Sequence, residues 1–138
     1  MTRIDFHTNV GDPLAYACRL TRKAYASGRA LVVFAEARRL AAFDEQLWTF
    51  VPLEFVPHCM AKSPLAQNTP VVLASNLDDV PHHQVLVNLG APVPAQFTRF
   101  ERLIEIVGNG EEELSAGRER FRFYRDRGYS IETHKQGA

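Results

Sequence analysis

Arginine residues recur through the segment 114–128, which reads LSAGRERFRFYRDRG. Its basic residues are Arg118, Arg120, Arg122, Arg125 and Arg127, against Glu119 and Asp126. At about 100° per helical residue, Leu114, Arg118 and Phe121 fall on one stripe, continued by Arg125 and flanked by Arg122. A guanidinium beside an aromatic ring suits a carboxylate, an acidic peptide or a phosphate. The alternative is a solvated basic helix end whose aromatic side chains pack inward, namely Phe121, Phe123 and Tyr124.

A second segment, 47–58, reads LWTFVPLEFVPH and carries a single charge, Glu54. Its large apolar residues are Trp48, Phe50, Val51, Leu53, Phe55, Val56 and Pro57. A segment broken by prolines cannot easily turn all of these toward a small core. Some of them are therefore candidates for an exposed patch that binds a partner protein, where Trp and Phe are common anchors. Burial under the edge of a sheet is the competing interpretation.

Motifs for nucleotide binding and catalysis are missing from the sequence. No GxxxxGK[ST] or GxGxxG loop follows a predicted strand, and no GxSxG, HExxH or EF-hand motif is present. Gly108-Asn109-Gly110 runs into three glutamates at 111–113, which would repel a phosphate at that helix start. We therefore predict no catalytic residue, no cofactor and no bound metal.

Histidine and cysteine residues offer no better site. His82-His83 lies near Asp78 and Asp79, but adjacent strand residues point to opposite faces, so a solvated turn is favoured over a metal site. His58 is interpreted as a hydrogen-bonded structural histidine. Cys18 fits the apolar face of a helix, and no CxxC pair joins it to Cys59.

Strand and helix patterns alternate along the chain, which is typical of an α/β sheet flanked by helices. Strands are predicted at 2–7, 29–35, 71–74, 84–89, within 102–107 and at 129–132. Helices are predicted from Asp12-Pro13 to Gly28, at 37–48 and at 111–127, with a surface loop at 61–69. The continuous apolar run RALVVFA indicates a strand covered on both faces. The predicted fold is a Rossmann-like sheet without a phosphate-binding loop.

Composition narrows the class of protein. The chain has 138 residues, of which 46% are hydrophobic and 23% charged, and we predict one domain over 1–138. Sixteen basic residues balance sixteen acidic ones, so the formal net charge is zero and wholesale coating of nucleic acid is unfavourable. The first residues carry no apolar signal segment and no run is long enough to span a bilayer, so a cytoplasmic protein without membrane contact is expected.

The apolar segment 47–58 followed by the arginine-rich segment 114–128, at this spacing, resembles the chi subunits of bacterial DNA polymerase III. The resemblance rests on LW-x6-FVPH, the strands PVVLAS and VLVNL, and RERFRFYRDRGY at 118–129, and it covers nearly the whole chain. It implies a non-catalytic accessory subunit of the clamp loader, with a nucleotide-free Rossmann-like fold. The implied partners are the acidic C-terminal tail of single-stranded-DNA-binding protein and the psi subunit or another clamp-loader component, with DNA contacted only indirectly.

The resemblance also implies two sets of binding residues. The tail site corresponds to Val107, Arg118, Phe121 and Arg122. In it, Arg118 pairs with the terminal carboxylate of the tail, Arg122 pairs with acidic side chains, and the other two form an apolar wall. The psi-facing patch corresponds to Trp48, Phe55, Val56 and Pro57.

Two positions depart from the family pattern. Leu114 stands where a lysine usually contributes to the tail site, and Phe121 where a tyrosine is usual. The loss of one exposed cation is expected to weaken tail binding by about 1 kcal/mol. The alternatives kept open are a small nucleotide-binding enzyme on the same fold and a direct binder of single-stranded nucleic acid.

Overall fold

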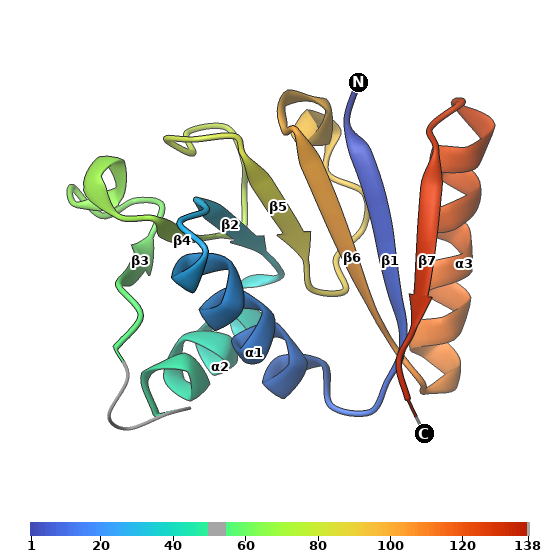
Figure 1. Cartoon of the computed structure of the whole chain (residues 1–138), viewed down its shortest axis with the longest axis horizontal. Helices are drawn as coiled ribbons and strands as arrows, with labels where there is room; N and C mark the ends of the chain where they lie inside the picture. Colours follow the sequence, from blue (N-terminus) through green and yellow to red (C-terminus); the bar gives the residue numbers. More distant parts are fainter. Residues whose placement is uncertain (50–54, 138) are drawn as a thin grey trace.

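A single parallel sheet organises the chain in the computed structural model, which describes residues 1–49 and 55–137. The strand order is β3-β4-β2-β5-β6-β1-β7 (Figure 1). The strands are β1 (Arg3–Val10), β2 (Leu31–Phe34), β3 (His58–Met60), β4 (Val71–Ala74), β5 (Val85–Asn88), β6 (Arg102–Gly108) and β7 (Ile131–Lys135). The helices are α1 (Pro13–Ala26), α2 (Ala37–Thr49) and α3 (Glu111–Asp126), with short 3₁₀ helices η1 (Ala66–Asn68) and η2 (Ala95–Arg99).

Local signals set the bounds of the first helix. The Asp12 carboxylate accepts a hydrogen bond from the Ala15 N–H at 3.2 Å, and Pro13 occupies the first turn, where its missing N–H costs nothing. After the helix, Gly28 adopts a φ of +79°, the left-handed conformation that glycine tolerates best. The cap and the stop predicted from sequence are both confirmed.

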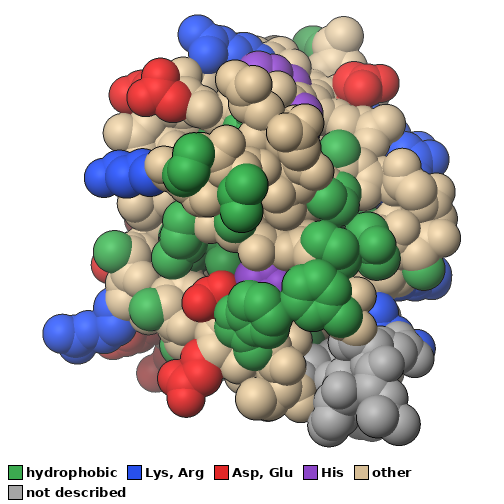
Figure 2. Space-filling model, turned by 90° about the vertical axis from the view of Figure 1, so that its left-hand side faces the viewer, with side chains coloured by type: hydrophobic (Ala, Val, Ile, Leu, Met, Phe, Trp, Pro, Cys, Tyr) green, Lys and Arg blue, Asp and Glu red, His purple; other side chains and the backbone are tan. Residues whose placement is uncertain are grey.

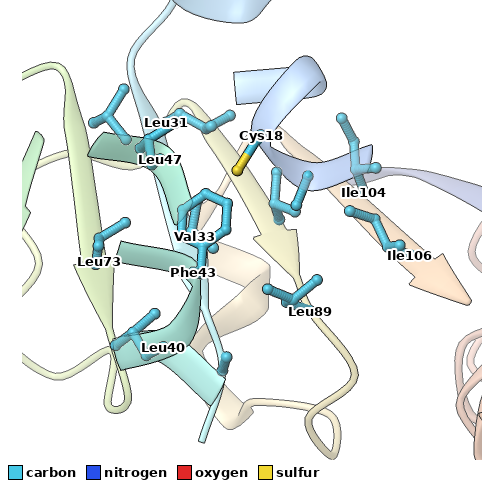
Figure 3. Packing of buried hydrophobic residues seen from close by; sticks show 14 of the residues in the cluster. Cys18, Leu31, Val33, Leu40, Phe43, Leu47, Leu73, Leu89, Ile104 and Ile106 are labelled. Carbon is cyan, nitrogen blue, oxygen red and sulfur yellow. The ribbon is translucent and has the colours of Figure 1, made fainter. Parts of the chain in front are cut away.

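Helices cover the two faces of the sheet unequally. Helices α1 and α2 pack on one face and α3 on the other (Figure 1). In the first layer Cys18 and Phe43 are fully buried against strand residues such as Val33 (Figure 3). On the α3 side of the sheet, residues of the connecting segments such as Ala66 and Leu77 pack with β2 and β4, so these strands are buried on both faces, which explains their continuous apolar sequences.

The fold class predicted from sequence is confirmed, with local omissions. Strand β3 was not predicted, and η1 lies within the segment interpreted as a loop. His82 and His83 are half-buried rather than solvated, and the His83 ring packs against Phe100 with centroids 5.2 Å apart. Phe50, Val51, Leu53 and Glu54 of the apolar segment lie outside the described residues. None of the described helices has the length and apolar character that crossing a membrane requires.

Candidate functional site

A buried polar network seats α3 on the sheet. Glu105 of β6 is fully buried, and its carboxylate accepts hydrogen bonds from Arg120 Nε at 2.9 Å, Tyr124 Oη at 2.6 Å and Asn88 Nδ2 at 3.1 Å. Burial raises the pKa of Glu105, while the Arg120 guanidinium and the hydrogen bonds oppose that rise. Because two of the donors lie on α3, one turn apart, the network fixes the rotation of the helix about its axis.

Close packing brings α3 down onto the end of β6. A Cβ atom at Gly117 would lie 2.8 Å from Val107 Cγ1, so only glycine allows this approach. Val107 is 4% exposed and lies beneath the helix. Phe121 is half-buried, and its ring meets that of Phe6 edge to face at 5.3 Å between centroids. Of the two residues expected to form an apolar wall, Val107 is core and Phe121 still offers part of its surface.

The structure separates the five arginines of this region by what they contact. Arg120 is buried against Glu105, Arg125 forms an ion pair with Asp126 at 3.1 Å, and the Arg127 guanidinium stacks 3.5 Å from the Phe123 ring centroid. Arg118 and Arg122 are exposed, and neither has a hydrogen bond or ion pair within residues 1–49 and 55–137. The two arginines predicted to bind carboxylates are thus the two whose guanidiniums are unengaged in the described structure.

This arrangement combines the two interpretations that the sequence left open. Tyr124 is buried and Phe121 and Phe123 are half-buried, so the aromatic side chains do pack inward. Arg118 and Arg122 are nevertheless exposed, within one helical turn of the half-buried Phe121. Such a surface can form forked hydrogen bonds to a carboxylate next to an apolar contact.

An apolar patch occupies the opposite end of the molecule, around β3. We define it by four exposed side chains: Trp48 at 54%, Phe55 at 62%, Met60 at 40% and Leu65 at 66%. Figure 2 views the molecule from this side and shows hydrophobic side chains gathered there. Exposure of this much aromatic and aliphatic surface is unusual unless a partner covers it.

Ring contacts hold the centre of the apolar patch in place. The Trp48 ring lies 5.4 Å from Phe55 and 4.5 Å from His58, between centroids. His58 is buried, with Nδ1 2.6 Å from the Val56 carbonyl oxygen and Nε2 3.2 Å from Asp44 Oδ1, so the predicted structural histidine is confirmed. Aromatic anchors fixed before binding cost less entropy on association.

The four residues predicted for the partner surface differ in how far their side chains are exposed. Trp48 and Phe55 are exposed, Pro57 is half-buried and Val56 is a core residue at 7% exposure. Met60 and Leu65 were not predicted, although Met60 also lines a cavity of about 490 Å³ with Leu40 and Leu73. A strand signal at 58–60 could have placed Met60 on the exposed edge of the sheet, but three residues are too few to show alternation.

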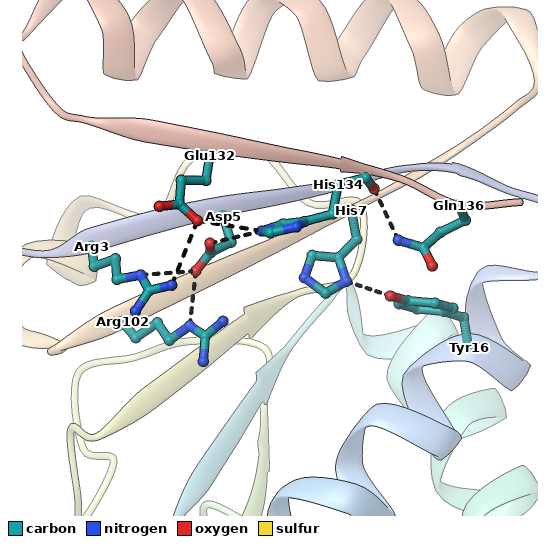
Figure 4. Close-up of polar contacts among 8 residues, drawn as sticks. All are labelled: Arg3, Asp5, His7, Tyr16, Arg102, Glu132, His134 and Gln136. Carbon is teal, nitrogen blue, oxygen red and sulfur yellow. Dashed lines mark hydrogen bonds and ion pairs between the residues drawn. The ribbon is translucent and has the colours of Figure 1, made fainter.

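A cluster of charged side chains joins β7 to β1 (Figure 4). The fully buried carboxylate of Asp5 accepts a hydrogen bond from Arg102 Nε at 2.8 Å and lies 3.1 Å from His134 Nε2. Burial alone raises the pKa of Asp5, but the hydrogen bonds from Arg102 and His134 hold it below its ordinary value. The cluster is therefore an ionised anchor for the last strand.

Three side chains of the same cluster lie close enough together to hold a metal ion, but arginines already balance the charge of the two carboxylates. Ligand atoms of Asp5, Glu132 and His134 lie within 4.8 Å of one another. Arg102 and Arg3 face the Asp5 carboxylate, and Arg3 also lies 3.6 Å from Glu132. Two guanidiniums supply the positive charge that a cation would bring, so we assign the cluster a structural role.

A cavity of about 210 Å³ opens beyond the carboxyl ends of β5 and β6. Open α/β sheets commonly bind ligands at this place. Here the cavity is lined by Glu112 and Glu113 from the start of α3, beside Arg39 and Arg120. Two carboxylates at the helix start oppose the binding of a nucleotide phosphate at this place.

Comparison with known proteins identifies relatives over almost the whole chain. Residues 1–132 match the family described as "DNA polymerase III chi subunit, HolC". The DNA polymerase III subunit chi of Pseudomonas aeruginosa is 33% identical over 140 residues, which cover 98% of this chain and 97% of that protein. The protein of the same name from Haemophilus influenzae is 27% identical over 123 residues, covering 88% of this chain and 85% of that protein.

Proposed function

The chain belongs to the DNA polymerase III chi subunit family, and on that premise we propose that it is a non-catalytic subunit linking the replicase to single-stranded-DNA-binding protein. The observation that carries the proposal is the pair of exposed guanidiniums of Arg118 and Arg122, which lie on the same helix as Phe121 and have no partner among residues 1–49 and 55–137. They suit the acidic, carboxylate-ended tail of the DNA-coating protein. In this role the subunit contributes to DNA replication without a catalytic residue of its own.

Each residue of the tail site has a distinct task in this proposal. Arg118 forms a forked hydrogen bond with the terminal carboxylate of the tail, and Arg122 pairs with acidic side chains nearby. The exposed part of Phe121 packs against the last apolar side chain of the tail, while buried Val107 supports the helix from below. Many identical tails on coated DNA raise the effective affinity of one modest site.

The apolar patch is proposed to dock the subunit onto the clamp loader, through psi or another component. Trp48 and Phe55 supply the anchors, with Val56 and Pro57 shaping the backbone between Phe55 and His58. Strand β3 and strand β7 are the opposite edges of the sheet. The two surfaces can therefore be occupied at once, as a link between two assemblies requires.

The test is a fluorescence-polarisation titration with an acidic peptide ending in Pro-Phe, beside a copy that lacks the final Phe. We expect saturable micromolar binding that the truncation abolishes, because it removes the last apolar side chain and moves the terminal carboxylate back by one residue. Arg118→Ala should abolish binding while leaving the fold intact. Arg38→Ala removes an exposed helical arginine from α2 and should leave the affinity unchanged.

Two results would contradict this proposal. Unchanged affinity in Arg118→Ala would show that the peptide binds elsewhere. Absence of binding up to millimolar peptide, together with a shift of naked single-stranded DNA in a gel, would favour direct nucleic-acid binding instead.

A further inference from the structure

Strand β7 presents different chemistry on its two faces. Ile131, Thr133 and Lys135 are in register with Ile4, Phe6 and Thr8 of β1. Ile4 and Phe6 belong to the buried cluster under α3, so the three β7 residues share the α3 side of the sheet. Glu132 and His134 alternate with them and join the Asp5 cluster on the other side (Figure 4).

Helix α3 leaves the end of this face uncovered. Ile131 is half-buried with the cluster under α3, but Thr133 and Lys135 are exposed. The turn at Gly128 reverses the chain between α3 and β7, so the last residues of β7 lie beside the first turns of the helix (Figure 1). An uncovered strip of sheet therefore runs along the flank of α3 that carries Leu114 and Phe121.

Cations without a partner in the part of the chain that the structure describes border this strip on both sides. Arg118 and Arg122 stand on the helix, and Lys135 stands on the strand. The structure gives the Lys135 ammonium no ion pair or hydrogen bond among the residues it describes, since Glu132 lies on the opposite face. Glu111, at the start of α3, is the acid on the same helical stripe and would direct an anionic peptide away from that end.

We propose that Lys135 is a further binding residue of the tail site, so that the peptide lies between α3 and β7. This inference rests on the proposed function and adds a second wall to its site. Lys135 pairs with an acidic side chain of the peptide, while Arg118 holds the terminal carboxylate. Side-chain specificity then comes from two consecutive elements, the helix α3 and the edge strand β7.

The strand that carries Lys135 is fixed without help from the Lys135 side chain. The Gln136 N–H donates to the Thr8 carbonyl at 2.9 Å, and Asn9 Nδ2 donates to the Gln136 carbonyl at 3.2 Å. On the other face, His134 lies 3.1 Å from Asp5. Replacing the exposed Lys135 should therefore leave the fold and the position of β7 unchanged.

The test is Lys135→Gln in the same peptide titration at low salt. We expect about a two- to fivefold loss of affinity, the range for one exposed charge pair. Lys62→Gln removes an exposed lysine near the opposite edge and should have no effect. Adding Leu114→Lys to Lys135→Gln should restore affinity, because it returns a cation to the same strip from the helix side.

A peptide whose acidic residues are changed one at a time to amides sharpens the assignment. The amide change that faces Lys135 should weaken binding to the wild-type protein and have little further effect on Lys135→Gln. If Lys135→Gln binds every peptide like the wild type while Arg118→Ala does not bind, the inference is wrong and the proposed function stands. If Arg118→Ala also binds normally, the proposed function itself fails.

Discussion

The two edges of the sheet are built from opposite chemistry. At the β3 edge, the exposed large apolar side chains are Trp48, Phe55, Met60 and Leu65. The β7 edge instead offers Arg118, Arg122 and Lys135, cations that pair with none of the described residues, beside a strand anchored by ion pairs. One edge suits a partner that buries apolar area, and the other suits a partner that brings negative charge.

This difference matters because apolar and charged surfaces respond to different variables. Burial of aromatic anchors sets how slowly a complex dissociates and depends little on salt. Charge complementarity speeds association and weakens as salt screens it. A linking subunit benefits from both, with a durable attachment at one edge and an exchangeable contact at the other.

The largest loss of stability should come from breaking the buried network around Glu105, which holds α3 at the charged edge. Arg120→Ala leaves the Glu105 carboxylate buried without its ion-pair partner, which should lower the free energy of unfolding by about 3–5 kcal/mol. Loss of this support also releases α3, so tail binding should fall. Urea denaturation followed by circular dichroism measures the stability change.

A matched substitution two residues away separates support from recognition. Arg118→Ala removes the same side chain from the exposed side of the same helix, and should change stability by no more than about 0.5 kcal/mol. Equal destabilisation by the two variants would mean that the network around Glu105 does not hold the helix as described.

The next largest effect is the loss of partner binding when an anchor is removed from the apolar patch. Phe55→Ala removes an anchor of the patch and should weaken binding of the psi-type partner by about 2 kcal/mol or more, measured by calorimetry. The fold should lose less than about 1 kcal/mol, because the Phe55 side chain is 62% exposed. A loss of thermal stability typical of a core truncation would show that Phe55 is a packing residue rather than an anchor. Tail affinity is the internal control and should not change.

The sequence predicted what depends on local pattern and missed what depends on register. The cap at Asp12, the apolar run at 29–35 and the acid-first, base-last helix at 111–127 are local signals. The structure has α1, β2 (Leu31–Phe34) and α3 (Glu111–Asp126) at these places. Strand β3 has three residues and a single neighbouring strand, so its sequence carries no usable periodicity.

Which arginines are free could be predicted only in part. The contact of Arg127 with Phe123 spans one helical turn and is readable from sequence. The pairing of Arg120 with Glu105 joins residues of different elements, and the sequence offers no reason to select Arg120 over Arg118. The position of Lys135 on the α3 side follows only from the pairing of β7 with β1.

A smaller effect is the pH dependence of the free energy of unfolding, which should differ between variants at the two edges. The native pKa of Asp5 is below 3.8, its ordinary value, so ionised Asp5 stabilises the fold above about pH 4 and this contribution is lost as the pH falls through the native pKa. Asp5→Asn should therefore lower the free energy of unfolding at pH 7 by about 1–2 kcal/mol, and the difference from the wild type should shrink toward pH 3. Thermal denaturation across this range measures it.

The β3 edge supplies the control for that experiment. Asp44→Asn changes a carboxylate that is 35% exposed beside His58, so its cost at pH 7 should be smaller. A difference for Asp5→Asn that stays constant from pH 7 to pH 3 would show that packing of the side chain, and not its charge, anchors β7.

The smallest expected effect is the salt response, and it tests the comparison most directly. Raising sodium chloride from about 50 to about 300 mM should raise the Kd of the tail peptide by about three- to tenfold, because exposed charges are screened over a few ångströms at the higher salt. The Kd of the partner at the apolar patch should change by less than about twofold. Equal salt dependence at both surfaces would mean that charge also dominates docking at the β3 edge, and the contrast between the two edges would then lie in their shape alone.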